Sequence, residues 1–255
     1  MSKLHTKRTF LYTLKASLVI TEKNARIYYL KAPVIIFGIL FPVFFFLAFA
    51  LGKKVVPFIL VPGLVAMTLF FTSSSVGPLI TPWERNAKTY ERLLASPVSL
   101  SSILLGDMLA GVIFGVIISS IPLTIGILFF NAKFFHPLFL AGNIVLSSLC
   151  FSSLGVLLAS PAAEAPSQVM MLSSLVRFPL IFISGIFIPL DKLPFWGKVI
   201  AFISPLTYTV DAMKYSLYDL KSYPAFINIL ALLFFSFVFF SIALKMHRKN
   251  LIKAL

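Results

Sequence analysis

The sequence predicts an all-α, polytopic integral membrane protein that forms one domain over residues 1–255 and crosses the membrane with six transmembrane helices. Of its 255 residues, 59% are hydrophobic and only 12% are charged, whereas about 25% of the residues in a soluble domain are charged. A spanning helix needs about 20 apolar residues, and the chain contains six apolar runs of this kind. These observations exclude a soluble enzyme, a disordered chain and an additional globular domain of ordinary size.

Residues 1–31 precede the first apolar run and are strongly basic. They contain no uninterrupted apolar core, which argues against a secretory signal peptide. Apolar and small residues recur at helical spacing at Phe10, Leu14, Leu18, Thr21, Ala25 and Tyr28. This pattern favours a basic amphipathic helix on the cytoplasmic membrane face; the alternative is a solvated basic tail.

The six spans follow from the apolar runs and the charges that interrupt them. Their expected bounds are about 32–51, 55–80, 103–130, 138–159, 168–189 and 225–244. Between the last two, residues 190–224 hold only two short apolar pieces, 195–203 and 206–218. Because these pieces are too short to cross a bilayer, we expect re-entrant or interfacial helices that form a cap on the outer side.

The distribution of lysine and arginine predicts that both termini are cytoplasmic. In that orientation fourteen basic residues lie inside, seven lie outside and Arg177 lies within a span. Basic residues collect on the cytoplasmic flanks of spans, so most of the net charge of +14 reflects topology. We therefore expect a lipid membrane as the environment and no nucleic acid as a partner.

The sequence holds no pattern that indicates catalysis or metal binding. Its three histidines, His5, His136 and His247, lie outside the expected spans, and its single cysteine is Cys150. There is no Gly-x-x-x-x-Gly-Lys-Ser/Thr motif to hold nucleotide phosphates. Ionisable residues within the spans are few, and no internal repeat is evident, which argues against a secondary transporter. We therefore expect that the chain is not an enzyme, that it holds no cofactor and that it is a subunit driven by a partner.

The polar link between the second and third spans is where a partner could bind. Pro82 and Pro97 bracket an expected helix over 83–96. Glu84, Lys88, Glu91 and Arg92 would share one face of this helix, and Tyr90, Leu93 and Leu94 would form an apolar side. From these residues alone, a solvated linker and a docking helix are equally acceptable.

The link resembles the cytoplasmic loop of type-2 ATP-binding-cassette (ABC) transporter permeases. That loop commonly reads Glu-Arg-Glu-x-Gly-Thr-Leu-Glu-Arg-Leu-Leu-x-Thr-Pro-Val-Ser, and this chain matches it at Glu84-Arg85 and from Thr89 to Ser99. Asn86-Ala87-Lys88 departs from the pattern. A second match resembles the family's Ser-Gly-x-Phe-x-Pro segment and its downstream Pro-x-Thr-Tyr element. Its residues are Ser184, Gly185, Pro189, Pro205 and Tyr208, which we place in an outer-cap motif.

The resemblance implies the permease of an exporter in a prokaryotic inner or plasma membrane. It would form a homodimer or a heterodimer with a second permease, seated on two copies of an ABC ATPase subunit that binds ATP and Mg. The 83–96 segment would be the coupling helix. Its polar contacts with the ATPase would come from Glu84, Arg85, Glu91 and Arg92, and its apolar packing from Leu93 and Leu94. Two alternatives are a non-transporting scaffold or assembly component and an ion-coupled secondary carrier.

Two charged residues lie within the expected spans. Asp107 falls in the first turns of the third span, where we expect capping or pairing at an interface; the alternative is a place on a substrate pathway. Arg177 lies in the fifth span, either on a substrate pathway or bound to carbonyls freed by Pro179. Serine pairs in the spans are interpreted as helix-packing positions, with a lining of the substrate route as the alternative; they are Ser73–Ser75, Ser119–Ser120, Ser147–Ser148 and Ser152–Ser153.

Overall fold

The structure is a computed structural model that describes residues 2–29, 31–36, 40, 43–44, 57–130, 133–161, 166–220 and 222–254. In these ranges the regular elements are helices, and no strand occurs. The helices are α1 (Ser2–Tyr28), α2 (Ala32–Ile35), α4 (Pro57–Asn86), α5 (Thr89–Ala95), α6 (Leu100–Phe130), α7 (Pro137–Leu158), α8 (Pro166–Ile183), the 3-10 helix η2 (Leu190–Lys192), α9 (Phe195–Ile203), α10 (Pro205–Tyr218) and α11 (Ala225–Ala254).

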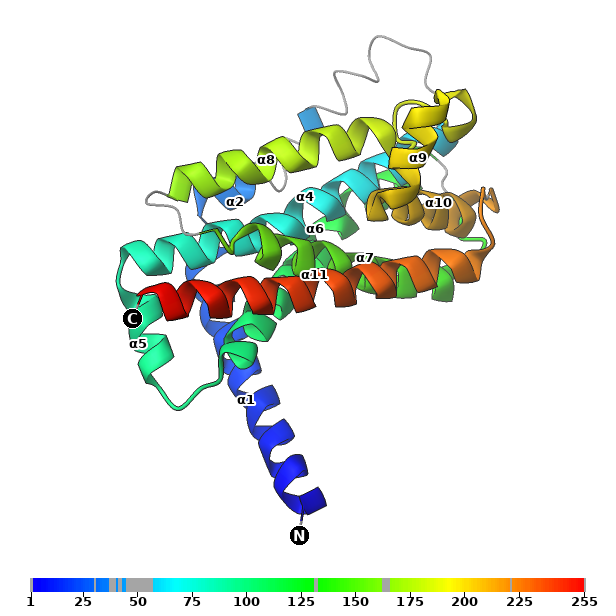
Figure 1. The fold of residues 1–255 in the computed structure, drawn as a ribbon. Coiled ribbons are helices and arrows are strands. Elements are labelled where there is room, and N and C mark those ends of the chain that lie inside the picture. The colour runs from blue at the N-terminus through cyan, green and yellow to red at the C-terminus, as the bar shows by residue number, and fades with distance from the viewer. Residues whose placement is uncertain are drawn as a thin grey trace.

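The long helices α4, α6, α7, α8 and α11 run along one common direction (Figure 1). The short helix α5 and the C-terminus lie at one end of this bundle, which we call the α5 end, and α9 and α10 lie at the opposite, α10 end. Helix α1 runs obliquely across the α5 end, with its N-terminus away from the bundle (Figure 1). The fold therefore has a helical body with a different set of short elements at each end.

Five helices in the described ranges are long and apolar enough to cross a membrane, which is consistent with a multi-pass membrane protein. They are Leu60–Asn86, Leu100–Phe130, Pro137–Leu158, Pro166–Ile183 and Ala225–Asn250. They coincide with the second to sixth expected spans. The first expected span, 32–51, lies mostly outside the described residues, and α2 covers its beginning.

Several helix boundaries differ from the expected ones. Helix α4 continues through Pro78 and Pro82 to Asn86 instead of ending near residue 80. Helix α8 ends at Ile183, before the expected limit at 189, and α11 continues past 244 to Ala254. Hydropathy marks where apolar residues stop, but a helix continues wherever its backbone groups find partners.

The core is built around α4, which is almost completely buried between α6, α7, α8 and α10. Its Phe70 ring packs edge-on against Phe151 of α7, with ring centroids 4.9 Å apart. At Gly77 the two helices touch through their backbones, because an added methyl group would lie 2.5 Å from the Gly155 carbonyl carbon. Small residues permit this close approach.

The serine pairs confirm this packing principle with one exception. The residues Ser73, Ser75, Ser119, Ser147, Ser148, Ser152 and Ser153 are all buried between helices. Ser120 is exposed, so its pair has only one packing member.

At the α10 end, the two short pieces expected between the last spans form helices. α9 matches the expected 195–203, and α10 begins one residue earlier than expected, at Pro205. Helix α10 is buried among α4, α7 and α11. Helix α9 leaves a large apolar face open, with Phe195 84% and Trp196 65% exposed.

Candidate functional site

The link between α4 and α6 at the α5 end is divided into two helical pieces. Helix α4 ends at Asn86, and Lys88 adopts a left-handed conformation with φ 55° before α5 begins at Thr89. The expected single helix over 83–96 is therefore wrong. The break falls on Asn86-Ala87-Lys88, the three residues that depart from the family pattern. The Thr89 hydroxyl donates to the Glu84 carbonyl oxygen at 3.2 Å and ties the two pieces together.

Helix α5 turns its apolar side toward its own chain. Tyr90 is buried and packs in one cluster with Ile20 of α1 and Ile103 of α6, and Leu93 and Leu94 pack partly against this cluster. Burial raises the pKa of the Tyr90 hydroxyl to about 12. We expected both leucines to pack on a partner, but in this structure they contact residues of their own chain. The Glu91 and Arg92 side chains are exposed on the outer side of α5.

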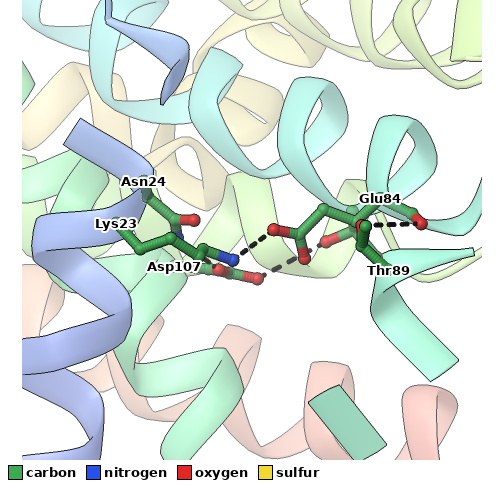
Figure 2. Close-up of polar contacts among 6 residues, drawn as sticks. Lys23, Asn24, Glu84, Thr89 and Asp107 are labelled. Atoms are coloured by element: carbon green, nitrogen blue, oxygen red, sulfur yellow. Dashed lines mark hydrogen bonds and ion pairs between the residues drawn. The ribbon is translucent and has the colours of Figure 1, made fainter. Parts of the chain in front are cut away.

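Glu84 is buried and forms an ion pair with Lys23 of α1 (Figure 2). Its side chain is 5% exposed and that of Lys23 is 31% exposed. We expected Glu84 to share an exposed face with Glu91 and Arg92, but it lies on a different helix and inside the chain. Burial of this kind requires a counter-charge, and α1 supplies it.

Arg85 is partly buried and also has partners within the chain. Its Nη1 donates to the Pro161 carbonyl oxygen at 3.2 Å, in the link that follows α7. Its guanidinium carbon lies 5.4 Å from the centroid of the Tyr90 ring, an attractive cation–π arrangement. Of the four expected polar contacts, Glu91 and Arg92 remain fully available to a partner.

Asp107 lies two turns inside α6 and is buried beside the Lys23–Glu84 pair (Figure 2). It accepts hydrogen bonds from Asn24 Nδ2 at 2.7 Å and from Thr81 Oγ1 at 3.5 Å. It does not cap α6, because the Ser102 amide donates to Ser99 Oγ at 3.1 Å at that helix start. Asp107 thus pairs with side chains of α1 and α4.

Helix α1 is held on α6 by hydrogen bonds that the sequence analysis missed. Ser17 Oγ donates to the Ser102 carbonyl at 3.0 Å, and Thr21 Oγ1 donates to the Gly106 carbonyl at 3.1 Å. A methyl group on Gly106 would lie 2.6 Å from Ile20 Cγ2, so the two backbones pass in close contact. The recurring small polar residues Ser17, Thr21 and Asn24, on one helical face, were the available signal.

The residues that we expected on one apolar face of α1 lie partly in the bundle and partly outside it, and the placement of α1 on the membrane face stays a prediction. Thr21 and Tyr28 are buried, but Leu14 and Leu18 are 43% and 53% exposed. The buried face is polar at its centre because it packs on backbone carbonyls of α6. The leucines point away from the bundle, where an apolar surface remains open.

Arg177 is buried within the bundle and bridges α8 to α4. Its Nη2 donates to the Ser74 carbonyl at 2.8 Å and its Nη1 to Ser75 Oγ at 2.9 Å. The Ser74 carbonyl would normally accept from the amide of residue 78, but Pro78 has no N–H. Arg177 thus binds a carbonyl freed by Pro78 on the neighbouring helix, and the expected partner site at Pro179 is wrong.

The outer-cap residues determine how the chain turns between α8 and α10. Ser184 Oγ donates to the Ile181 carbonyl at 2.9 Å, and Gly185 reverses the chain with φ 82°. Pro189 precedes η2, and Pro205 opens α10 at a position where no amide hydrogen is needed. Tyr208 is buried and its hydroxyl donates to the Phe202 carbonyl at 2.8 Å.

Asp211 of α10 is a buried carboxylate that the sequence analysis did not single out. It accepts from the Ser222 amide at 2.6 Å, the Tyr223 amide at 3.2 Å and Asn228 Nδ2 at 2.9 Å. These contacts anchor the link into α11.

At the α5 end, the exposed Glu91 and Arg92 side chains can bind charged groups of a partner. Among the described residues, no three His, Cys, Asp or Glu side chains are grouped so that they could hold a metal ion. Glu91 and Arg92 stand on a helix whose other side is packed on α1 and α6. Such an arrangement can bind a partner protein and pass a force to the long helices.

The chain is similar in sequence to known proteins. The ABC-2 type transporter family profile matches residues 16–218. The inner membrane transport permease YadH of Escherichia coli (strain K12) is 26% identical over 171 residues, which cover 65% of this chain and 64% of YadH. The probable multidrug ABC transporter permease YbhR of Escherichia coli (strain K12) is 27% identical over 155 residues, covering 60% of this chain and 42% of YbhR. ABC transporter G family member 20 of Dictyostelium discoideum is 28% identical over 204 residues, 75% of this chain and 27% of that protein.

In each of these comparisons, the chain spans less than two thirds of the relative's length. The family match, in contrast, extends from the middle of α1 to the end of α10 and includes α5 and the outer cap. It covers well over half of the chain, so the protein belongs to the ABC-2 type transporter family.

Proposed function

We propose that this chain is the membrane permease of an ABC exporter, which moves a substrate across the membrane with energy from ATP hydrolysed by a separate ATPase subunit. Membership of the ABC-2 type transporter family and the permease names of its relatives support the proposal. In the complete transporter, two permeases, identical or different, sit on two ATPase subunits that bind ATP and Mg. The α5 end and both termini then face the cytoplasm of a prokaryotic cell.

The observation that carries the proposal is the exposed Glu91–Arg92 pair on a supported helix. Buried Tyr90 on the opposite side of α5 packs against α1 and α6, so a load on the pair does not simply bend the link. One side chain of each sign also suits a protein surface better than an anionic lipid surface or nucleic acid. The pair therefore fits a cleft on an ATPase subunit.

The position of α5 explains how ATP-driven closure can reach the substrate route. Helix α5 connects α4 and α6, and each of these runs the length of the bundle (Figure 1). Residues of α1, α4 and α6 interlock through Lys23–Glu84 and Asn24–Asp107 (Figure 2). Displacement of α5 then moves a packed group of helices as a body, which is the general way that rigid elements switch access.

The experiment exchanges the two charges in the double variant Glu91→Arg with Arg92→Glu. The variant is co-expressed with an ABC ATPase subunit that co-purifies with the wild-type permease, and the complex is purified and reconstituted into liposomes. ATPase stimulation is then screened against candidate lipids and amphiphiles. We expect normal membrane insertion but a loss of ATPase binding or of stimulation. A matched control exchanges Glu22 and Arg26, an exposed ion pair on α1 that lies outside α5.

The possible results separate the proposal from its two alternatives. Wild-type stimulation in the Glu91–Arg92 exchange variant would refute the coupling role of this pair. Stable isolation without any nucleotide-hydrolysing partner would instead indicate a scaffold or assembly component. Transport that depends on an ion gradient and not on ATP would indicate a secondary carrier.

A further inference from the structure

The carboxyl end of α7 has free backbone carbonyls close to the candidate coupling site. The last carbonyls of a helix lack intrahelical donors. The Ser160 amide would normally donate to Val156, but it bonds the Leu157 carbonyl at 3.0 Å instead. Pro161 follows and has no N–H to offer. The carbonyls of Val156, Ser160 and Pro161 therefore need donors from elsewhere.

Three side chains from two other helices supply these donors. His247 Nε2 lies 3.1 Å from the Val156 carbonyl oxygen, and Asn250 Nδ2 donates to the Ser160 carbonyl at 2.6 Å. Arg85 Nη1 of α4 donates to the Pro161 carbonyl at 3.2 Å. A carbonyl only accepts, so His247, which is 1% exposed, carries its hydrogen on Nε2.

The two donors on α11 belong to the part of the helix that continues beyond the apolar run. In these last turns Lys245, Arg248 and Lys249 are exposed, whereas His247 is buried and Asn250 is partly buried. The helix thus presents a polar inner side to the end of α7 and a basic outer side. The inner side is built from residues that can donate hydrogen bonds to carbonyls.

Arg85 connects this contact to α5. It lies one residue before the end of α4, and its guanidinium covers the ring of Tyr90. A displacement of α5 that keeps the contact between Arg85 and Tyr90 therefore either carries the Pro161 carbonyl with it or breaks its hydrogen bond with Arg85. The last turns of α11 are attached to the same backbone segment through His247 and Asn250.

We propose that Arg85, His247 and Asn250 form a carbonyl clamp whose three members are positioning residues for coupling. The clamp makes α5, the carboxyl end of α7 and the C-terminal turns of α11 move as one body when the ATPase closes. This inference rests on the proposed function, and it adds the C-terminal turns of α11 to the coupling machinery.

The test measures distances between spin labels in the permease–ATPase complex in lipid nanodiscs, with and without ATP and vanadate. In a Cys150→Ala background, one label pair on Ala95→Cys and Lys249→Cys reports on α5 against the tail of α11. A second pair, on Ala95→Cys of this chain and the equivalent position of the second permease, reports on the separation of the two α5 helices. Both label sites on this chain are exposed. In the otherwise wild-type chain we expect nucleotide to shift the second distance and to leave the first unchanged.

The variants remove one donor at a time. In Asn250→Ala and His247→Ala we expect the first distance to shift with nucleotide, because loss of a donor to a buried carbonyl raises the separated population about tenfold. His247→Gln keeps a donor near the Nε2 position and should restore the wild-type behaviour. Arg248→Ala removes an exposed side chain of the same helical turn and should change nothing. If one alanine variant fails to insert, the other one and the His247→Gln rescue still decide the question.

Each result has a separate meaning. A nucleotide-dependent first distance in the wild-type background, or an unchanged one in both alanine variants, would overturn the clamp and leave the proposed function intact. If the second distance does not respond to nucleotide, the proposed function fails, and the clamp fails with it as a coupling device.

Discussion

The Lys23–Glu84 ion pair offers a quantitative test of how α1 is attached. Lys23→Met leaves the Glu84 carboxylate, whose side chain is 5% exposed, without its cation and close to the buried Asp107. Removing one partner of a buried pair costs about 3–5 kcal/mol. We expect about 3 kcal/mol, the lower end of that range, because Lys23 is 31% exposed and the pair is partly screened by solvent.

The assay uses thermal unfolding followed by a fluorophore that reacts with thiols. Cys150 is buried and is the only cysteine of the chain, so it becomes labelled when the bundle opens. Glu84→Gln should cost less than Lys23→Met, because the lysine that it leaves behind can reach water. The double variant should be more stable than Lys23→Met alone, since it contains no uncompensated buried carboxylate at position 84.

Arg26→Met is the matched control on the same helix. Arg26 pairs with Glu22 at 2.5 Å, but the two side chains are 77% and 61% exposed. An exposed pair of this kind is worth about 0–1 kcal/mol. Equal destabilisation by Lys23→Met and Arg26→Met would show that burial of Glu84 does not anchor α1.

Two further predictions concern Arg177 and Tyr90. Arg177→Met should strongly destabilise the protein in the same assay. Adding Pro78→Ala should restore part of the lost stability, because the new amide can donate to the Ser74 carbonyl. Strictly additive effects of the two substitutions would contradict this account. Burial raises the pKa of Tyr90 from 10.0 to about 12, so the folded state holds this proton more tightly than the unfolded state. The associated stability is present below pH 10 and is lost as the pH rises toward 12. Tyr90→Phe should therefore make the alkaline loss of stability less steep, as measured by tryptophan fluorescence, and an unchanged profile would refute the assignment.

The positions of the long helices could be predicted because the signal is local and repeated. Each of the five membrane-capable helices contains many apolar residues in succession, and the contribution of each residue adds to the same conclusion. The short pieces 195–203 and 206–218 were predicted for the same reason, since their length alone prevents a full crossing. The first expected span stays a prediction.

The polar residues at the α5 end were harder to interpret, because their roles depend on which helix lies opposite. In the sequence, Glu84 looks like an exposed charge in a polar link, but in the structure Lys23 of α1 lies beside it. In the sequence, Leu93 and Leu94 look like a docking face, but in the structure they pack partly against Ile20 and Ile103. Glu91 and Arg92, which point away from every helix that packs on α5, kept the exposed position that the sequence indicated.

Composition and the long apolar runs were enough to predict a helical membrane protein, and the link motif indicated the ABC-2 type family. Composition and the length of apolar runs are properties of the chain that no partner helix can change. The polar groups that face inward could be identified only once the helices were placed in space. Free carbonyls at Ser74, and at Val156, Ser160 and Pro161, are satisfied by side chains distant in sequence. A hydrogen bond between helices depends on their relative position, and that position follows from the packing of the whole bundle.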